Sequence, residues 1–193
     1  MKFMLKNYLD QFNLIIENVI VTTDKSESLS FDTAISLINK QLDAVKTQEK
    51  TIYLIGNGGS SGIVSHASVD LLNTCKLKAV ALTDNSQLTC FANDYGYENV
   101  YAKPLETLLS TEDMLIALSS SGNSRNILNA CRIAEKKETF TITLSGFSEN
   151  NLLRQIGNIN FWLKSGSYGM VEIGHALLLH VISDAYGGLI NKI

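Results

Sequence analysis

Short apolar segments alternate with amphipathic ones along most of the chain, and this alternation constrains the fold more than any other feature. Each apolar segment spans only six or seven residues, a length that suits a buried strand. Strands that alternate with helices form a parallel sheet whose two faces are both covered. The sequence therefore predicts an α/β fold with five strands, at residues 51–56 (TIYLIG), 78–83 (KAVALT), 114–119 (MLIALS), 139–145 (TFTITLS) and 158–163 (NINFWL).

Two helices are predicted before the first strand. Apolar side chains recur at helical spacing near the N-terminus, and residues 30–45 (SFDTAISLINKQLDAV) repeat this pattern. The last helix is predicted to begin near Tyr168. We therefore expect one domain over residues 1–193, with N-terminal helices in residues 1–48 and the α/β core in residues 49–193.

Composition excludes several classes of function. Charged residues make up 18% of the chain and the formal net charge is −3, without any basic tract, so no nucleic-acid partner is expected. No apolar run approaches the ~18 residues that a membrane helix needs, and the N-terminal segment lacks the features of a signal peptide, so no membrane association is expected. The three scattered cysteines, Cys75, Cys90 and Cys131, are expected to be buried thiols in a reducing compartment, which indicates a cytoplasmic protein.

Two loops rich in small residues follow the first and third predicted strands. Ligands of open α/β sheets bind beyond the carboxyl ends of the strands, so these loops are candidate binding sites. Glycine lets the backbone approach a ligand closely, and amide groups, hydroxyls and a helix N-terminus together suit a phosphate group. We predict that the two loops bind phosphate, through Gly56, Gly58, Gly59, Ser60 and Ser61 in GNGGSSG and through Ser119, Ser120, Ser121, Asn123 and Ser124 in SSSGNSRN.

The first loop also partly matches three known sequence motifs. It lacks the Gly-Lys-Ser/Thr of a P-loop, and Ser61 stands where the dinucleotide-binding fingerprint needs Gly or Ala, so no nucleotide cofactor is expected. Gly58, Ser60 and Gly62 satisfy the nucleophile-elbow pattern G-x-S-x-G, and His180 is available as the later histidine of a serine hydrolase. That alternative leaves the second serine loop without a role.

Two predicted helices each carry one carboxylate and one imidazole. His66 and Asp70 are four residues apart and share a helix face, whereas Glu172 and His180 are eight apart, about 80° around their helix. His175 lies about 140° away from His180. The apolar surroundings of His180 predict that it lies on a buried or subunit-facing side. Two acids and two histidines suit either proton shuttling or a divalent metal, and both uses stay open on this evidence.

Four segments together resemble the sugar isomerase (SIS) domain family, and within it the phosphoheptose isomerases: GNGGSSGIVSH, NDYGYENVY, SSSGNSRNILNA and YGMVEIGHALLLH. The resemblance covers nearly the whole chain. It implies a flavodoxin-like, three-layer αβα sandwich and a homotetramer with active sites at subunit interfaces. It also implies a cytoplasmic enzyme of bacterial heptose biosynthesis, which serves lipopolysaccharide or capsule. The implied reaction converts sedoheptulose 7-phosphate to D-glycero-D-manno-heptose 7-phosphate.

The resemblance also assigns roles to individual residues. It places the general base on Asp70 and the acid/base histidine on His180. It implies that some members hold zinc, through positions that correspond here to His66, Asp70, Glu172 and His180. The implied phosphate and substrate contacts are Asn57, Gly58, Ser60, Asn93, Asp94, Ser119, Ser120, Ser121, Ser124 and Glu172.

Two of these positions depart from the usual pattern of the family. Well-known members have glutamate where Asp70 stands and glutamine where Glu172 stands. Aspartate is one methylene shorter, and a displacement of about 1 Å at a reacting group can cost about 10²-fold in rate. The alternative to an isomerase is therefore a non-catalytic SIS module that binds a sugar phosphate or a protein partner.

Overall fold

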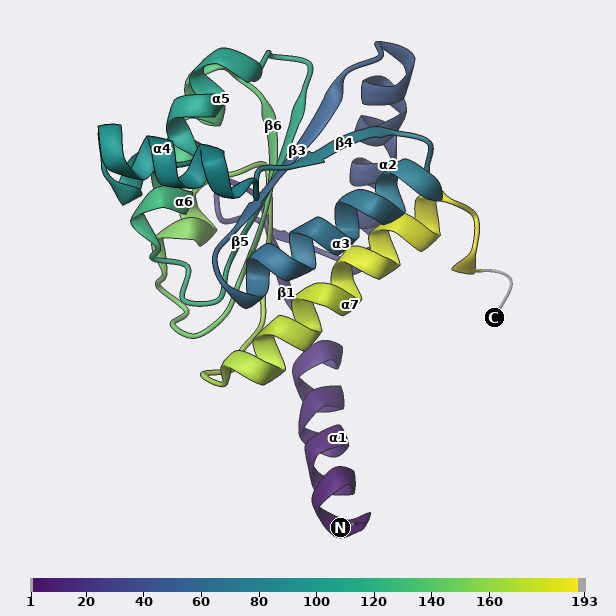
Figure 1. Ribbon diagram of the computed structural model, residues 1–193. Helices are drawn as coiled ribbons and strands as arrows, with labels where there is room; N and C mark the ends of the chain where they lie inside the picture. The colour runs from purple at the N-terminus through teal and green to yellow at the C-terminus, as the bar shows by residue number, and fades with distance from the viewer. Residues whose placement is uncertain (1, 191–193) are drawn as a thin grey trace.

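The computed structural model describes residues 2–190 and contains one sheet of seven strands, in the order β2-β1-β7-β6-β5-β3-β4 (Figure 1). The five strands from β4 to β7 in this order are mutually parallel, whereas β1 and β2 add an antiparallel pair at the β7 edge. The strands are β1 (Ile20–Thr22), β2 (Ser28–Leu29), β3 (Thr51–Gly56), β4 (Lys78–Ala81), β5 (Met114–Ser119), β6 (Phe140–Ser145) and β7 (Ile159–Trp162).

All five predicted strands are confirmed, but the prediction of a five-stranded sheet is wrong by two strands. The additional strands β1 and β2 lie inside residues 1–48, which were expected to contribute helices alone. They are three and two residues long, too short to leave a periodic signal in the sequence. Strand β1 exists because it pairs with β7, a contact that local sequence does not encode.

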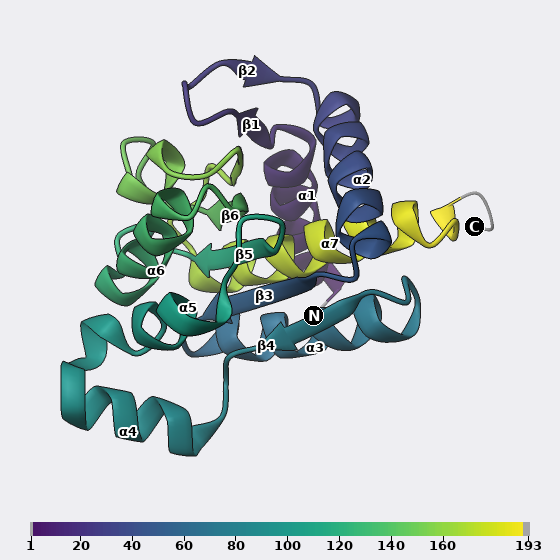
Figure 2. The same ribbon diagram turned by 90° about the horizontal axis from the view of Figure 1, so that it is seen from above.

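Helices cover both faces of the sheet, which confirms the predicted sandwich (Figures 1 and 2). Helices α2, α3 and α7 lie on one face, and α7 begins at Tyr168 as predicted. Helices α4, α5 and α6 lie on the other. None of the helices within residues 2–190 has the length and apolar character needed to cross a membrane. The helices are α1 (Lys2–Glu17), α2 (Phe31–Thr47), α3 (Gly59–Asn73), α4 (Asn85–Tyr95), α5 (Ala102–Leu108), α6 (Arg125–Lys136) and α7 (Tyr168–Tyr186), with short 3₁₀ turns at Tyr97–Asn99 and Leu152–Gln155.

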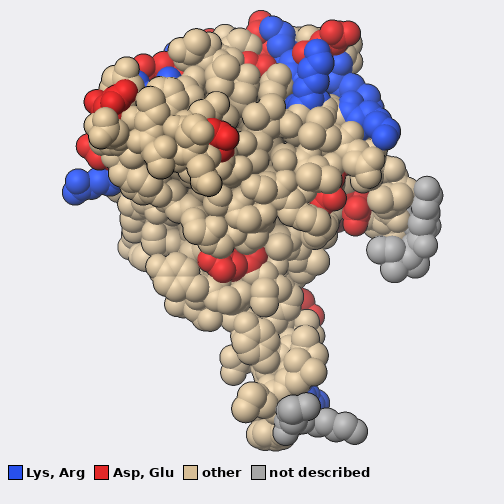
Figure 3. Space-filling model, in the orientation of Figure 1, with Lys and Arg blue, Asp and Glu red and all other residues tan. Residues whose placement is uncertain are grey.

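Helix α1 differs from the others because it projects from the body of the molecule (Figure 1). Phe3, Met4, Leu5 and Leu14 are exposed along it, and its surface is largely uncharged (Figure 3). An apolar helix surface of this extent is unusual on a monomeric protein.

The strands divide the core into two clusters by simple alternation. In β3, Ile52 and Leu54 point to the cluster beneath α2, α3 and α7, whereas Tyr53 and Ile55 point to the cluster beneath α5 and α6. Side chains alternate in this way because successive residues of a strand face opposite sides of the sheet. Both sides are apolar, as expected for a parallel sheet that is covered on both faces.

The order of the five parallel strands is the flavodoxin-like 2-1-3-4-5 when they are numbered along the chain, as the resemblance implied. The order reverses between β3 and β5, the first and third of these strands. The connections that follow two such strands run to opposite faces of the sheet, here into α3 and α6. A crevice therefore forms between the two connections. The two serine loops begin at this crevice.

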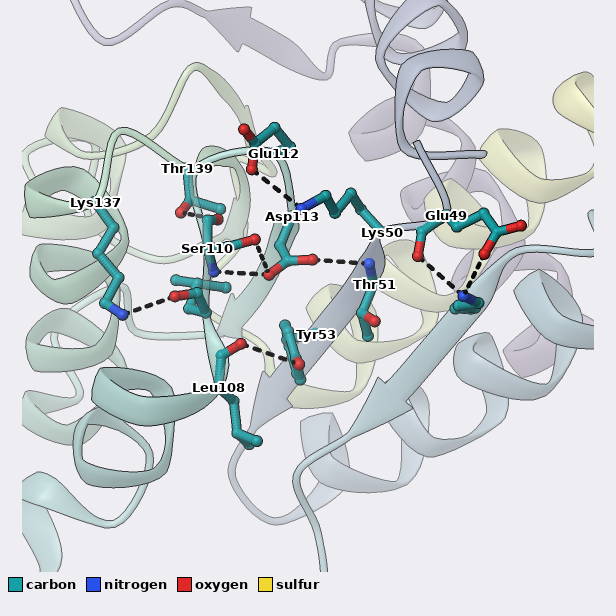
Figure 4. Close-up of polar contacts among 12 residues, drawn as sticks. Glu49, Lys50, Thr51, Tyr53, Leu108, Ser110, Glu112, Asp113, Lys137 and Thr139 are labelled. Carbon is teal, nitrogen blue, oxygen red and sulfur yellow. Dashed lines mark hydrogen bonds and ion pairs between the residues drawn. The ribbon is translucent and has the colours of Figure 1, made fainter. Parts of the chain in front are cut away.

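The opposite end of β3 and β5 is fastened by the buried carboxylate of Asp113 (Figure 4). One of its oxygens accepts a hydrogen bond from the amide of Thr51 at 2.8 Å, and the other accepts from the amide and the hydroxyl of Ser110, both at 2.7 Å. Lys137 donates to the carbonyl of Leu109 at 2.7 Å beside this network. These contacts fix the relative register of the two strands, and therefore the positions of the loops at their far ends.

Candidate active site

A cavity of about 150 Å³ lies at the crevice between β3 and β5. It brings together seven of the predicted binding residues from both loops and from α7, although these segments are far apart in the sequence. Two further residues, Leu118 and Tyr168, complete its wall. We call this cavity the serine cavity; the seven predicted residues are Asn57, Ser60, Ser119, Ser120, Ser121, Ser124 and Glu172.

Two helix N-termini, of α3 and α6, border the serine cavity without a side-chain cap. Gly58 precedes α3 with a φ of 53°, a conformation that favours glycine. Ser124 precedes α6, and its hydroxyl accepts a hydrogen bond from Ser119 at 3.1 Å instead of capping the helix. The positive ends of two helix dipoles and several hydroxyl groups suit an anion, and none of the residues that line this cavity is lysine or arginine.

The turn after β3 is held by close packing and by one buried hydroxyl. A side chain at Gly56 would meet backbone atoms of Ser60 at 2.8 Å, so only glycine lets α3 start this close to the strand. The hydroxyl of Tyr101 donates to the carbonyl of Gly56 at 2.6 Å. Burial raises the pKa of Tyr101 to about 12, which keeps this hydroxyl protonated and able to donate.

His66, Asp70 and His180 form a second group, which we call the His–Asp cluster. Asp70 Oδ2 lies 3.3 Å from His180 Nδ1 and 3.6 Å from His66 Nε2. Helices α3 and α7 pack side by side, and this contact brings the three side chains together (Figures 1 and 2). The cluster lies in a groove of about 280 Å³ that begins at Gly59, next to Ser60 of the serine cavity.

The His–Asp cluster is open to solvent in the isolated chain. The side chains of His66, His180 and Asp70 are 65%, 46% and 25% exposed. The prediction that His180 lies on a buried side is therefore wrong within one chain, and its subunit-facing alternative stays a prediction.

Glu172 lies apart from the His–Asp cluster. The ligand atoms of His66, Asp70 and His180 all lie within 4.8 Å of one another, and Glu172 is not part of that group. Although Glu172 and His180 lie on roughly the same side of α7, eight residues of helix also separate them by about 12 Å along its axis. The carboxylate of Glu172 instead lies where a side chain on Gly59 would point, in the serine cavity.

The His–Asp cluster has the donor set of a metal centre. Two imidazole nitrogens and one carboxylate oxygen are the ligand types that zinc and similar divalent ions prefer. Three protein ligands that leave a further position open are typical of catalytic zinc sites. The geometry of these residues therefore fits a metal ion held by three side chains.

Asn93 and Asp94 are not brought to either group. They lie exposed on α4, where Asn93 donates to Asp94 at 2.9 Å, and they line neither the serine cavity nor the groove of the His–Asp cluster. Sequence reasoning gave no role to Tyr97 and Asn126, which hydrogen-bond to Asn57. Both residues lie inside the segments that carried the family resemblance. The sequence could therefore have pointed to these positions, but it could not predict that their side chains contact Asn57.

The structure also disfavours the serine hydrolase alternative. Ser60 is 3% exposed and belongs to the first turn of α3, and no hydrogen bond among the described residues joins it to a histidine. His175 is fully buried on another side of α7 from His180, with Nε2 3.2 Å from the carbonyl oxygen of Ser145.

Cys90 is exposed, so the expectation that all three cysteines are buried is wrong for this one.

Comparison with known proteins agrees with this arrangement. The sequence model of the SIS domain matches residues 7–146. The phosphoheptose isomerase of Helicobacter pylori (strain P12) is 34% identical over 149 residues, covering 74% of this chain and 77% of that protein. The phosphoheptose isomerase of Thiobacillus denitrificans is 36% identical over 147 residues, covering 72% and 75%.

Solved structures show the same likeness. A phosphoheptose isomerase from Francisella tularensis superposes with a TM-score of 0.81 and 25% identity, covering 96% of this chain and 97% of that one. The phosphoheptose isomerase from Neisseria gonorrhoeae gives a TM-score of 0.73 and 28% identity, covering 80% and 83%. The family match over most of the chain and these relatives together mean that the chain belongs to the SIS domain family and, within it, to the phosphoheptose isomerases.

Proposed function

We propose that the chain is a phosphosugar isomerase that converts sedoheptulose 7-phosphate to D-glycero-D-manno-heptose 7-phosphate. The observation that carries this proposal is the placement of the serine cavity and the His–Asp cluster on either side of the first turn of α3. An anion-binding cavity beside a carboxylate–imidazole pair is what an aldose–ketose isomerase of a sugar phosphate requires.

The serine cavity is the proposed phosphate site. Ser119, Ser120, Ser121 and Ser124 supply hydroxyl groups, and the uncapped N-terminus of α6 supplies amide groups. A hydrogen bond to a charged group contributes about 1.5–3 kcal/mol, so three or four of them are enough to hold a phosphomonoester without a lysine. The carboxylate of Glu172 in the same cavity opposes a doubly charged phosphate and favours a position of the phosphate near α6.

The proton transfers are assigned to Asp70 and His180. Aldose–ketose exchange removes a proton from the carbon beside the carbonyl and returns a proton to the former carbonyl carbon. Asp70 accepts the carbon-bound proton as the general base, and His180 moves a proton between the two neighbouring oxygens. Without a bound metal, the 3.3 Å between Asp70 Oδ2 and His180 Nδ1 lets the two residues exchange a proton directly.

Zinc is the metal that we propose for the His–Asp cluster, held by His66, Asp70 and His180. When bound, such an ion stabilises the negative charge that develops on a substrate oxygen during enolisation. Glu172 is not needed as a ligand in this assignment, in contrast to the four-residue set that the family resemblance implied.

We also propose that the protein works as a homo-oligomer, a tetramer by its resemblance to the family, in the cytoplasm. Enolisation benefits when water is excluded, yet the His–Asp cluster is open in the single chain. Exposed apolar residues lie on the two helices that carry the cluster, Val69 and Leu72 on α3 and Ile173 and Leu177 on α7. A second copy packed on this face would cover both the apolar residues and the cluster.

Exchange of substrate protons in D₂O, followed by NMR, tests the proposed function. The wild-type protein is expected to exchange the proton beside the carbonyl of sedoheptulose 7-phosphate and to form the heptose 7-phosphate. The Asp70→Asn variant is expected to lose at least about 10²-fold in rate, because it lacks the base. As a control, Asp43→Asn changes a carboxylate on α2 that accepts from Tyr186 and should keep the wild-type rate.

Two outcomes would contradict the proposal. Turnover that survives in Asp70→Asn would remove the base assignment. Absence of exchange in the wild-type protein, together with a rise in melting temperature on addition of the sugar phosphate, would instead support a non-catalytic binding module.

A further inference from the structure

We propose that Asn126 and Tyr97 are positioning residues that lock the carboxamide of Asn57 in one orientation, so that it presents a single N–H donor to the ligand in the serine cavity. The pair of side chains Asn57 and Asn126 is joined by two reciprocal hydrogen bonds, of 2.9 and 2.8 Å. This inference rests on the proposed function for the identity of the ligand, a sugar phosphate.

The orientation of Asn126 follows from a backbone group. The amide of Ile127 is 3.0 Å from Asn126 Oδ1, and a backbone N–H can only donate. The atom of Asn126 that faces Ile127 is therefore its oxygen, and its nitrogen must point toward Asn57.

The orientation of Asn57 follows from that of Asn126. The nitrogen of Asn126 donates at 2.8 Å, so the atom of Asn57 that receives it is the oxygen, Oδ1. The hydroxyl of Tyr97 lies 3.2 Å from the same oxygen and therefore donates to it as well. Both lone pairs of Asn57 Oδ1 are thus occupied by donors from two different segments of the chain.

One hydrogen of Asn57 remains available to a ligand. Its nitrogen carries two hydrogens, of which one is donated to Asn126 Oδ1 at 2.9 Å. Asn57 lines the serine cavity, so the second hydrogen is the polar group that this side chain can offer there. A donor at this place matches a phosphate or carbonyl oxygen of the substrate, whereas a rotated carboxamide would present its own oxygen and repel both.

Burial makes the orientation of the Asn57 carboxamide depend on its hydrogen bonds to Asn126. Asn126 is 2% exposed, so water cannot readily replace a lost partner. The pair also joins the turn after β3 to the first turn of α6, and so ties the two loops of the serine cavity to each other. A change at Asn126 should act on the ligand only through Asn57.

A double-mutant cycle tests this dependence. Asn126→Asp keeps the size of the side chain but places a second oxygen against Asn57 Oδ1. It should lower kcat/KM by at least about tenfold, the factor expected when a buried donor is lost. In an Asn57→Ala background the same change should cost less than about twofold, because residues that act as a unit are not additive. Equal losses in both backgrounds would overturn the proposal, since a merely structural role is additive.

Two further variants sharpen the cycle. Tyr97→Phe removes only the hydroxyl and should lower kcat/KM in the native background but not in Asn57→Ala. Asn129→Ala is the matched control, because Asn129 ties the same helix α6 to the carbonyl of Glu98 at 2.9 Å without touching Asn57. Asn129→Ala should keep the wild-type kcat/KM.

NMR of the Asn57 side-chain amide separates this inference from the proposed function. In ¹⁵N-labelled protein, Asn126→Asp and Tyr97→Phe should each shift the Asn57 amide signals, and Asn129→Ala should not. Inorganic phosphate or the sugar phosphate should shift one of the two Asn57 protons in the wild-type protein. If the Asn57 amide signals are unchanged in both Asn126→Asp and Tyr97→Phe, the inference is overturned. If these signals shift but sedoheptulose 7-phosphate is not turned over, only the proposed substrate is overturned.

Discussion

Asp70 Oδ2 lies 3.3 Å from His180 Nδ1, across the contact between α3 and α7. The two residues are 110 positions apart, and neither helix alone could create this pair. The same carboxylate oxygen also faces His66 at 3.6 Å, from the preceding turn of its own helix. This arrangement, a carboxylate between two imidazoles, supports both the proposed proton transfer and the proposed metal site.

Metal content distinguishes three ligands from four. We expect the wild-type protein to retain zinc after dialysis, and His66→Ala and Asp70→Asn to lose most of it, because each variant lacks one of three ligands. Glu172→Ala, which removes every ligand atom of this side chain, should retain the wild-type zinc content, because Glu172 lies outside the His–Asp cluster. Elemental analysis of the dialysed proteins provides the measurement. Loss of zinc in Glu172→Ala would restore the four-ligand set.

Gly59→Ala should displace Glu172 without unfolding the protein. An added methyl group would collide with the carboxylate of Glu172, which is the far end of a flexible side chain. We expect the KM for the sugar phosphate to change as it does in Glu172→Ala, and the double variant to show no further change. Stability should stay equal or rise by up to about 1 kcal/mol, because alanine favours a helix over glycine.

The control for this substitution is Gly166→Ala. Gly166 has open space where a side chain would point and lines neither the serine cavity nor the groove of the His–Asp cluster. Its KM should match that of the wild type. Steady-state kinetics of the four variants would refute the placement of Glu172 if Gly59→Ala and Glu172→Ala changed KM independently.

His175 should make the fold sensitive to acid. Burial lowers the pKa of His175 to about 4, from about 6.5 in an unfolded chain. Because the folded state disfavours the charged form, the contribution of neutral His175 is complete above pH 6.5 and is lost as the pH falls toward 4. A shift of this size corresponds to about 3 kcal/mol of unfolding free energy.

Urea unfolding between pH 7 and pH 4 measures this effect. The free energy of unfolding should fall more steeply with acid in the wild-type protein than in His175→Leu, which has nothing to titrate at this position. His175→Leu also removes one of the two partners of the Ser145 carbonyl, which keeps the hydrogen bond from the amide of Leu163 at 3.0 Å, so the stability of the variant at pH 7 should be lower. Parallel pH profiles for the two proteins would contradict the prediction.

Ile173→Asp should weaken association between copies. Ile173 is exposed on α7, on roughly the same side of the helix as His180, and a charge there opposes burial in an interface. We expect sedimentation to show a smaller species and turnover to fall with it. Leu108→Asp, at an equally exposed site on the opposite face of the sheet, should leave the assembly unchanged. An unchanged assembly in Ile173→Asp would place the interface elsewhere.

Sequence reasoning found the parts of the fold that carry strong local signals. The five parallel strands are short, largely apolar runs of four to six residues, and their alternation with helices fixes the class of the fold. Strands β1 and β2 were not predicted, because their strand conformation depends on pairing, of β1 with β7 and of β2 with β1, and not on local sequence. The serine cavity was predictable because its loops follow strands whose carboxyl ends must meet at one edge of the sheet.

The remaining parts of the site depend on distances that sequence spacing does not give. Helical periodicity placed Glu172 and His180 on one side of α7, but it describes angle and not rise, so it joined two residues that lie about 12 Å apart along the axis. The amide pair of Asn57 and Asn126 joins residues 69 positions apart. Only the packing of β3 against β5 brings these two together.

The outer strands of the sheet have a consequence for how the protein behaves in a crowded solution. At one edge β2 is two residues long, and at the other β4 is four residues long and begins with Lys78. Short and charged edge strands are poor templates for the addition of a foreign strand, so they protect a sheet from fibrillar aggregation. Growth through the sheet is thereby suppressed, and the surfaces left for specific association are those of the helices.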